Sequence, residues 1–307
     1  MIGILLVLFF LITAFLIFYK NIRIDNFERS NPTRFYTPRV KETEEWHVVP
    51  LRLFQTWNTR NLPPKMSKCV ERLKQMNPEF DHYLYDDADC RRYIKENFHE
   101  QVVWAYDQLI PGAYKADLWR YCVLYKMGGI YLDIKFQCEP DFSLMELTKD
   151  PETFVLDRPY EDLKMKVDEN ISLVNSHDFY TTILNTKHEW WSENDNKIGL
   201  YNAVMASIPN NPIFYTCIQE IVKNVQTKYY GDSPLSPTGP ILLGKVFYKD
   251  KYTTKIKELK YFNSIEGTCV INKKRKVLTH FPEYRKEQRQ NNVDHYGVLW
   301  MNKKIYK

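Results

Sequence analysis

The stretch GGIYLDIKF, residues 128–136, places an aspartate and a lysine two positions apart, directly after a short apolar run. Two carboxylates at this spacing would hold a divalent metal ion, because hard cations prefer oxygen ligands. An ammonium group has only hydrogen-bond donors and cannot coordinate a metal. Asp133 and Lys135 therefore raise the question of which charged ligand binds here, and whether a metal ion takes part.

A second pair of opposite charges lies upstream. Asp117 and Arg120 are three positions apart, so they share one face of a predicted helix and could form an ordinary ion pair. That helix is otherwise apolar, and a partly buried ion pair stabilises it little because desolvation offsets the attraction. In a cleft, the same two groups would offer a hydrogen-bond acceptor beside a planar donor fork, which suits ligands rich in hydroxyl or phosphate groups. Both interpretations stay open at this point.

The elements that must position these residues alternate between strands and helices. We expect strands at 52–57, 80–85, 130–136 and 153–156, and helices at 63–76, 86–98, 113–127, 212–228 and 241–247. From residue 261 onward we expect short strands joined by turns. This alternation predicts an α/β fold with a mainly parallel, Rossmann-like sheet flanked by helices. Ligands bind beyond the carboxyl ends of such strands, where Asp133 and Lys135 would follow a strand core at 130–132.

The N-terminus predicts a membrane anchor. Residues 1–19, MIGILLVLFFLITAFLIFY, contain no charged side chain, and a membrane-spanning helix needs about 20 apolar residues. Lys20 and Arg23 follow this run and no basic residue precedes it, which favours a retained single-pass transmembrane helix over a cleaved signal peptide. Residues 20–47 are polar and aperiodic, so we expect a stem there and a folded domain at 48–307. We expect an internal membrane, of the Golgi or endoplasmic-reticulum type or another, and the charge pattern leaves the side open.

Charge is unevenly spread over the 307 residues. Residues 245–307 contain 16 Lys and Arg against 6 Asp and Glu, and the rest of the chain contains 27 against 32. The basic C-terminal segment suggests an anionic ligand or a membrane surface nearby, or else a solvated lysine-rich face. The six cysteines lack metal-ligand spacing, and there is no Walker loop, GxGxxG, GxSxG or HExxH pattern. ATPases, dinucleotide-dependent enzymes, serine hydrolases and zincins therefore lose their usual sequence support.

The segment KADLWRYCVLYKMGGIYLDI, residues 115–134, resembles the signature of glycosyltransferase family 32, the DXD-containing sugar transferases that include fungal initiating mannosyltransferases. A similar arrangement of Asp-x-x-Arg and GG-x-Y-x-D occurs in the clostridial glucosylating toxins. Further segments resemble the family in the same order: LFQTWNTRNLPP at 53–64, YNAVMASIPNNPIF at 201–214, PTGP at 237–240 and HYGVLW at 295–300. The resemblance runs from about residue 48 to the end of the chain. It implies a GT-A fold that transfers a sugar from a nucleotide-sugar donor with retention at the anomeric carbon.

The resemblance also implies roles for single residues beside the donor. Gln55 and Trp57 match positions next to the donor nucleotide, where an indole can stack on the base. Asp117 and Arg120 match the pair that holds donor ribose or sugar hydroxyls. These four residues are therefore expected to bind the nucleotide-sugar.

The DXD motif itself departs from the family pattern. Asp133 matches its first aspartate, which contacts metal and ribose, while Lys135 takes the place of the second. His295 and Trp300 match the C-terminal loop that closes over the donor diphosphate. In one hypothesis, Asp133, His295, donor phosphates and water hold Mn²⁺ or Mg²⁺; in the other, Lys135 supplies the cation and no metal is needed. We favour the first, because Asp133 and a histidine able to act as a ligand are both present.

These features predict an enzyme that moves a hexose or N-acetylhexosamine from a nucleotide-sugar to a glycan or glycolipid hydroxyl, with Asp117, Arg120, Asp133 and Lys135 at its catalytic centre. The expected partners are the donor, the acceptor and the membrane, and no nucleic acid. No carboxylate in the motifs is an obvious nucleophile, so we expect front-face substitution in which the leaving diphosphate deprotonates the acceptor. Two other classes stay open: a non-catalytic nucleotide-sugar- or carbohydrate-binding protein with a degenerate DXD site, and a glycoside hydrolase that uses Asp117 and Asp133.

Overall fold

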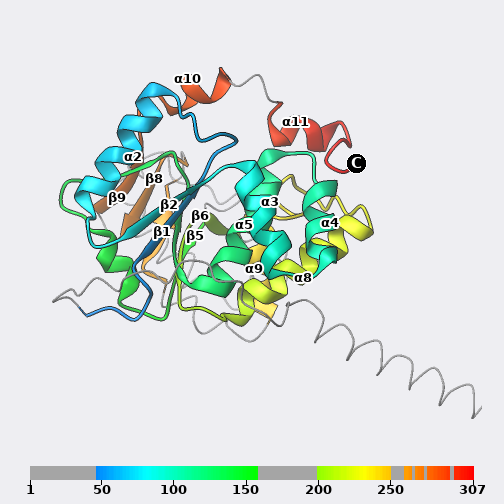
Figure 1. The fold of residues 1–307 in the computed structure, drawn as a ribbon, viewed down its shortest axis with the longest axis horizontal. Coiled ribbons are helices and arrows are strands. Elements are labelled where there is room, and N and C mark those ends of the chain that lie inside the picture. The colour runs from blue at the N-terminus through cyan, green and yellow to red at the C-terminus, as the bar shows by residue number, and fades with distance from the viewer. Residues whose placement is uncertain (1–45, 158–198, 250–258, 265–266, 273–274, 291–293) are drawn as a thin grey trace, which may run out of the picture.

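The computed structural model describes residues 46–157, 199–249, 259–264, 267–272, 275–290 and 294–307. Nine strands within these residues form one sheet, in the order β2-β1-β3-β6-β5-β7-β8-β9-β4. Their bounds are β1 (Arg52–Thr56), β2 (Asp81–Tyr85), β3 (Gly129–Leu132), β4 (Phe136–Cys138), β5 (Glu152–Leu156), β6 (Leu200–Ser207), β7 (Tyr261–Asn263), β8 (Cys269–Asn272) and β9 (Arg275–His280). The described part of the chain is therefore an α/β fold built on a single sheet (Figure 1).

This sheet is mixed, and the prediction of a mainly parallel sheet is wrong. β1 pairs in parallel with β2 and β3, and β5 pairs in parallel with β7, whereas the other five neighbouring pairs are antiparallel. Only two residues join β8 to β9, and so short a connection permits only antiparallel pairing. β6 lies between β3 and β5 and runs against both, an arrangement that local sequence patterns do not reveal.

The strand predicted at 130–136 is two strands in the structure. β3 ends at Leu132, and the chain turns through residues 133–135, where the Phe136 amide donates to the Asp133 carbonyl at 3.1 Å. β4 then pairs with β9, at the far end of the strand order. Because so short a connection spans at most about 14 Å, the far edge of the sheet must return to β3. The turn that carries Asp133 and Lys135 therefore lies between β3, near one end of the strand order, and β4, at the other end.

Helices cover both faces of the sheet (Figure 1). One face packs against α3 (Asp87–Asn97), α4 (Glu100–Gln108), α5 (Gly112–Met127), α8 (Pro212–Gln226) and α9 (Pro240–Lys249). The other packs against α2 (Pro64–Met76) and the 3₁₀ helix η1 (Leu144–Thr148). Of two short C-terminal helices, α10 (Tyr284–Arg289) lies on α2 and α11 (Tyr296–Met301) lies on α5. All five predicted helices are confirmed, with ends that shift by at most two residues, whereas α4, β6 and η1 have no counterpart among the predicted elements. The expectation of short strands from residue 261 onward holds for β7, β8 and β9 and is wrong for α10 and α11.

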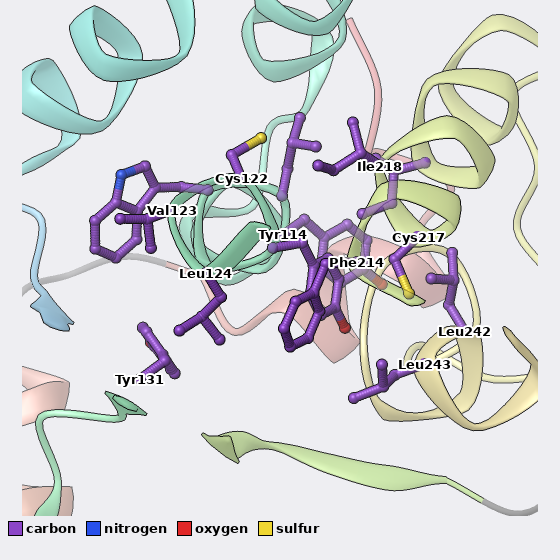
Figure 2. Packing of buried hydrophobic residues seen from close by; sticks show 14 of the residues in the cluster. Tyr114, Cys122, Val123, Leu124, Tyr131, Phe214, Cys217, Ile218, Leu242 and Leu243 are labelled. Atoms are coloured by element: carbon purple, nitrogen blue, oxygen red, sulfur yellow. The ribbon is translucent and has the colours of Figure 1, made fainter. Parts of the chain in front are cut away.

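The central helix α5 is buried on all sides, as its apolar sequence predicts. Residues 118–124 are all buried, and Arg120 is the one charged side chain among them. Figure 2 shows Cys122, Val123 and Leu124 leaving α5 in different directions, with Phe214 of α8 close by. The buried guanidinium of Arg120 must therefore be paired with carboxylates or carbonyl oxygens inside the fold, because burying an unpaired charge is costly.

The start of α2 fixes the position of α10. Pro63 precedes α2 and provides no side-chain cap for the free amides of its first turn. Glu287 of α10 provides this cap, because its two carboxylate oxygens accept from the backbone amides of Lys65 and Met66, each at 2.8 Å. A carboxylate is also favoured at a helix N-terminus by the helix dipole. This contact holds α10, and with it Arg285, beside the turn at 133–135.

The predicted transmembrane anchor, residues 1–19, lies outside the described residues, as does the stem up to residue 45. In the part of the chain that the structure does describe, no helix is both long and apolar enough to cross a membrane. The boundaries at 19, 47 and 48 stay predictions.

A pair of glycines joins α5 to β3. Gly128 and Gly129 have φ angles of 61° and 110°, which L-residues with side chains rarely adopt. A Cβ at Gly129 would lie 2.7 Å from the carbonyl oxygen of Arg52, on the neighbouring strand β1. Both glycines are therefore needed for the chain to pass from the helix into the sheet.

We expect Gly129→Ala to lower the free energy of unfolding by about 2–3 kcal/mol, because the substitution adds both backbone strain and a clash. Gly112→Ala is the matched control, since a Cβ at Gly112 meets nothing within 4 Å. It should change the free energy by less than about 1 kcal/mol. Urea unfolding followed by circular dichroism measures both values. Equal effects of the two substitutions would contradict this role of Gly129.

Candidate active site

Two adjoining cavities lie at the turn that follows β3. The larger has a volume of about 520 Å³, and Trp57, Tyr131 and Tyr296 are among its aromatic lining residues. The smaller has a volume of about 180 Å³ and a more polar lining that includes Asp117 and Lys135. Both are lined by Ala113, Arg120, Asp133, Arg285 and Tyr296. Arg120 and Asp133 therefore stand at the junction of an aromatic and a polar compartment.

Asp117 is held by donors from three segments of the chain. Its Oδ1 accepts from Asn202 Nδ2 at 2.9 Å, and its Oδ2 accepts from the Thr238 hydroxyl at 2.7 Å. Arg120 Nη2 lies 3.3 Å from Oδ1. Burial raises the pKa of Asp117, and the charge of Arg120 and the bond from Thr238 oppose that rise. The carboxylate is thus fixed in one orientation at the floor of the polar cavity.

Arg120 lies between two carboxylates. Its Nη1 is 3.2 Å from Asp133 Oδ1 and donates to the carbonyl oxygen of Asn202 at 2.7 Å. The guanidinium also stacks over the Tyr131 ring, 4.2 Å from the centroid. Burial lowers the pKa of Arg120, but Tyr131, Asp133 and Asp117 outweigh that effect and raise it above its ordinary value. The ion pair predicted between Asp117 and Arg120 is present, and it is one half of a larger buried network.

Asp133 and Lys135 form a close ion pair. Lys135 Nζ lies 2.7 Å from Asp133 Oδ2, and the Tyr131 hydroxyl donates to Oδ1 at 2.8 Å. Burial alone would raise the pKa of Asp133, but Lys135 and Arg120 lower it to about 2. Burial would likewise lower the pKa of Lys135, and Asp133 raises it above its ordinary range. The pair is therefore fully ionised at neutral pH.

Tyr201 and His280 are neutral neighbours of Lys135. The ammonium lies 5.1 Å from the ring centroid of Tyr201 and is hydrogen-bonded to its hydroxyl, whose pKa burial raises to about 12. Burial and the charge of Lys135 together lower the pKa of His280 to about 3. His280 Nε2 is buried without a hydrogen-bond partner among the described residues. Of these two neighbours in the polar cavity, Lys135 is therefore charged at neutral pH and His280 is not.

Trp57 and His295, two of the predicted site residues, line the larger cavity. Trp57 Nε1 is buried without a hydrogen-bond partner among the described residues, so the indole is not fixed by a polar contact there. His295 is the N-cap of α11, and its Nδ1 accepts from the Gly297 amide at 3.2 Å. Both residues line the same cavity as Arg120 and Asp133.

Gln55 and Trp300 do not line either cavity. Gln55 is fully buried in β1, and its Oε1 lies 2.8 Å from His82 Nε2. Trp300 donates from Nε1 to the carbonyl oxygen of Tyr230 at 2.8 Å, which holds the indole against the helices. Neither side chain is placed to touch a ligand in these cavities.

Five residues of the site have no counterpart among the predicted site residues. Asn202 and Thr238 hold Asp117, and Asp157 and Asn263 line the polar cavity, where Asn263 donates to Asp157 at 3.0 Å. Arg285 of α10 lines both cavities. Asn202 and Thr238 belong to segments that resemble the family, so the resemblance located the segments but not the side chains. Nothing in the sequence around Asp157, Asn263 and Arg285 indicates this position.

The side chains at the DXD position do not fit a divalent metal ion. Asp133 Oδ2 is occupied by the Lys135 ammonium, and Oδ1 by Tyr131 and Arg120. A dication there would be repelled by two fixed positive charges. Across the described residues, no group of three or more His, Cys, Asp and Glu side chains could hold a metal. Among these residues, Asp133 and His295 have no third such ligand beside them, so the misfit rests on the contacts that already occupy both oxygens of Asp133.

Comparison with protein families identifies the region that carries these side chains. Residues 63–152 match the family model described as the glycosyltransferase sugar-binding region containing a DXD motif. This range runs from α2 into β5 and includes Asp117, Arg120, Asp133 and Lys135. The resemblance to the DXD-containing sugar transferases is therefore confirmed over this region of the chain.

Several of the curated relatives are fungal mannosyltransferases. Inositol phosphoceramide mannosyltransferase 2 of Schizosaccharomyces pombe is 24% identical over 261 residues, which is 84% of this chain and 63% of the relative. The initiation-specific alpha-1,6-mannosyltransferase of Candida albicans is 30% identical over 97 residues, 30% of this chain and 25% of the relative. The chain thus spans less than two thirds of the length of these proteins. Among solved structures, the PaToxG glycosyltransferase aligns with a TM-score of 0.44 and 15% identity, covering 84% of this chain and 85% of that one.

We expect the fold to lose stability as the pH falls from about 6.5 to about 4, because two histidines are kept neutral by burial. The pKa of His82 is lowered from 6.5 to about 4, and that of His280 to about 3. Between these values the unfolded chain binds protons that the folded chain does not, so stability is complete above pH 6.5 and declines below it. Each histidine adds up to about 1.4 kcal/mol per pH unit to the slope.

Urea unfolding at several pH values between 7 and 4.5 measures this slope. The variant His82→Gln should show a shallower dependence than the unmodified chain, since one of the two proton-binding sites is gone. An identical slope in the variant would contradict the account of His82.

Proposed function

We propose that the chain is a glycosyltransferase that moves a hexose or N-acetylhexosamine from a nucleotide-sugar donor to a hydroxyl group of a glycan or lipid acceptor. The observation that carries the proposal is the position of Arg120, between Asp117 and Asp133 and at the junction of two cavities. A nucleotide-sugar has an aromatic end, a charged diphosphate and a hydroxyl-rich sugar. The site offers an aromatic cavity, a charged junction and a polar cavity in the same order.

The polar cavity suits the sugar. It is lined by Asp117, Asp157, Asn202 and Asn263, whose carboxylate and amide groups can accept from and donate to sugar hydroxyls. Asp117 is fixed by Asn202 and Thr238, so its orientation does not have to be set when the ligand binds. Such preorganisation limits the ordering cost of binding.

The aromatic cavity suits the nucleoside. Trp57 lines it from the end of β1, and Tyr284 and Tyr296 line it from the C-terminal helices. Its volume of about 520 Å³ falls in the range of small-molecule sites. A base stacked on Trp57 would leave its diphosphate at Arg120, where the two cavities join.

We further propose that substitution occurs on the front face of the sugar, with retention. Each of the carboxylates Asp117 and Asp133 already receives three donors, so neither is placed as a nucleophile for a double displacement. The bond between the anomeric carbon and the phosphate oxygen breaks, and the acceptor oxygen bonds to that carbon. The acceptor proton passes to the leaving diphosphate. Arg120 stabilises the negative charge that develops there.

The names of the curated relatives suggest what to test first. Those reported above are mannosyltransferases, and one is named for inositol phosphoceramide. We therefore propose mannose as the sugar and a glycolipid as the acceptor. A lipid acceptor also suits the predicted N-terminal anchor, since it would hold the site near a membrane.

Two other functions compete with this proposal. A glycoside hydrolase needs one protonated carboxyl group beside the scissile bond, but the pKa of Asp133 is lowered to about 2. Burial raises the pKa of Asp117, but both of its oxygens accept from Asn202, Thr238 and Arg120, so it is not placed to give a proton to a leaving group. A non-catalytic nucleotide-sugar-binding protein is favoured by one observation, the lysine at the second DXD position. Binding of donors without hydrolysis or transfer would identify it.

The proposal is tested by incubating the full chain in detergent with a panel of nucleotide-sugars, including GDP-mannose and UDP-hexoses, with and without inositol phosphoceramide. We expect release of nucleoside diphosphate from one donor and a mannosylated lipid product. Absence of both turnover and donor hydrolysis across the panel would contradict the proposal.

We expect Asp117→Asn and Asp133→Asn each to lower the rate of donor turnover by about 100-fold or more, because each removes a charge that positions Arg120 and the donor. Asp107→Asn is the matched control, since Asp107 forms an exposed ion pair with Arg91 on the outer helices. It should retain full activity. Melting curves establish that the variants are folded, and turnover at the unmodified rate in either site variant would contradict the proposed site.

A further inference from the structure

We propose that Lys135 takes the place of the divalent metal ion, so that the donor diphosphate is bound by Lys135 and Arg120 without a metal. This inference rests on the proposed function, and it names how that site holds its charged ligand. It also reverses the hypothesis favoured on the sequence alone, in which Asp133 and His295 hold the metal. The reasons lie in the contacts of Asp133, the charge balance and the burial of Lys135.

The contacts of Asp133 leave no position for a metal ion. Its two oxygens contact Lys135 at 2.7 Å, Tyr131 at 2.8 Å and Arg120 at 3.2 Å. A metal could bind only if the ammonium and the guanidinium withdrew, which would leave buried charges unpaired. The carboxylate binds these two cations instead, and holds Arg120 at the junction of the cavities and Lys135 in the polar cavity.

The charge balance is the same as in a metal-loaded site. A DXD pair of two carboxylates with one divalent cation has a net charge of zero. The pair of Asp133 and Lys135 also has a net charge of zero, because one carboxylate has become an ammonium. The diphosphate would therefore meet a similar local charge without any ion from solution. Arg285, which lines both cavities, adds a further cation.

Lys135 cannot simply turn out to solvent. Its side chain is only 15% exposed and lies between the Asp133 carboxylate and the rings of Phe136 and Tyr201. Its backbone is also fixed, since its carbonyl oxygen accepts from the Phe281 amide at 3.0 Å. An ammonium has three donors; Asp133 takes one, and the Tyr201 hydroxyl takes a second. The third remains for a ligand in the polar cavity that Lys135 lines.

Binding of nucleoside diphosphates tests the inference independently of turnover. GDP and UDP are titrated into the full chain in detergent by calorimetry, once with EDTA and once with MnCl₂. We expect at least one of them to bind, with dissociation constants that agree within about threefold in the two conditions. Binding that requires Mn²⁺ would overturn the inference alone. Failure of both ligands to bind under either condition would overturn the proposed function, and this inference with it.

The variant Lys135→Asp restores two carboxylates two positions apart and should reverse the dependence. We expect its affinity in EDTA to fall by about 100-fold and to return with MnCl₂, and electron paramagnetic resonance should detect bound Mn²⁺ in this variant and not in the unmodified chain. Lys68→Asp is the matched control, because Lys68 is exposed on α2, and it should bind as the unmodified chain does. Unchanged binding by Lys135→Asp in EDTA would overturn the inference.

A second variant keeps the test decisive where Lys135→Asp does not fold. Lys135→Met retains the length of the side chain and removes its charge. We expect it to lose affinity equally in EDTA and in MnCl₂, because it has neither the ammonium nor a second carboxylate. Unchanged affinity in EDTA would overturn the inference.

Discussion

Arg120 carries a guanidinium on a helix where the neighbouring residues are all buried. The groups that must pair with this buried charge constrain the rest of the site. Asp117 comes from the same helix, and Asp133 comes from the end of the adjacent strand β3. The Asn202 carbonyl of β6 completes the shell. Because a buried charge without partners is strongly destabilising, these groups must stay together in the folded protein. The same arrangement places Arg120 and Asp133 where two cavities join, with Asp117 and Lys135 beside them in the polar cavity.

The path of the chain follows from this constraint. α5 must end close to the sheet for Arg120 and Asp133 to meet, and the glycine pair Gly128 and Gly129 makes that turn possible. The strand must then end at Leu132, so that Asp133 and Lys135 project from a turn and not from a ladder. Since β4 follows this turn and pairs with β9, the C-terminal strands return to the same place. The polar cavity is therefore built from residues that are far apart in sequence.

The sequence predicted the parts of the site that depend on local spacing. Asp117 and Arg120 share a helix face, and Asp133 and Lys135 follow a strand, and the structure brings all four together. It could not predict Asp157, Asn263 and Arg285, because their place depends on the order of strands and on the contact of Glu287 with α2. The prediction of a mainly parallel sheet was wrong for the same reason, because the direction of β6 depends on its neighbours β3 and β5, which come from other segments. Gln55 and Trp300 lie away from the cavities because His82 and the Tyr230 carbonyl bind their polar atoms.

The central claim is that fixed cations, and not a metal ion, face the donor diphosphate. A crystal grown with a bound nucleoside diphosphate and MnCl₂, with diffraction measured at the manganese absorption edge, tests it most directly. We predict diphosphate oxygens within hydrogen-bonding distance of Lys135 Nζ and the Arg120 guanidinium, and no anomalous peak beside Asp133. A manganese peak bonded to Asp133, with Lys135 turned away from the diphosphate, would contradict the claim.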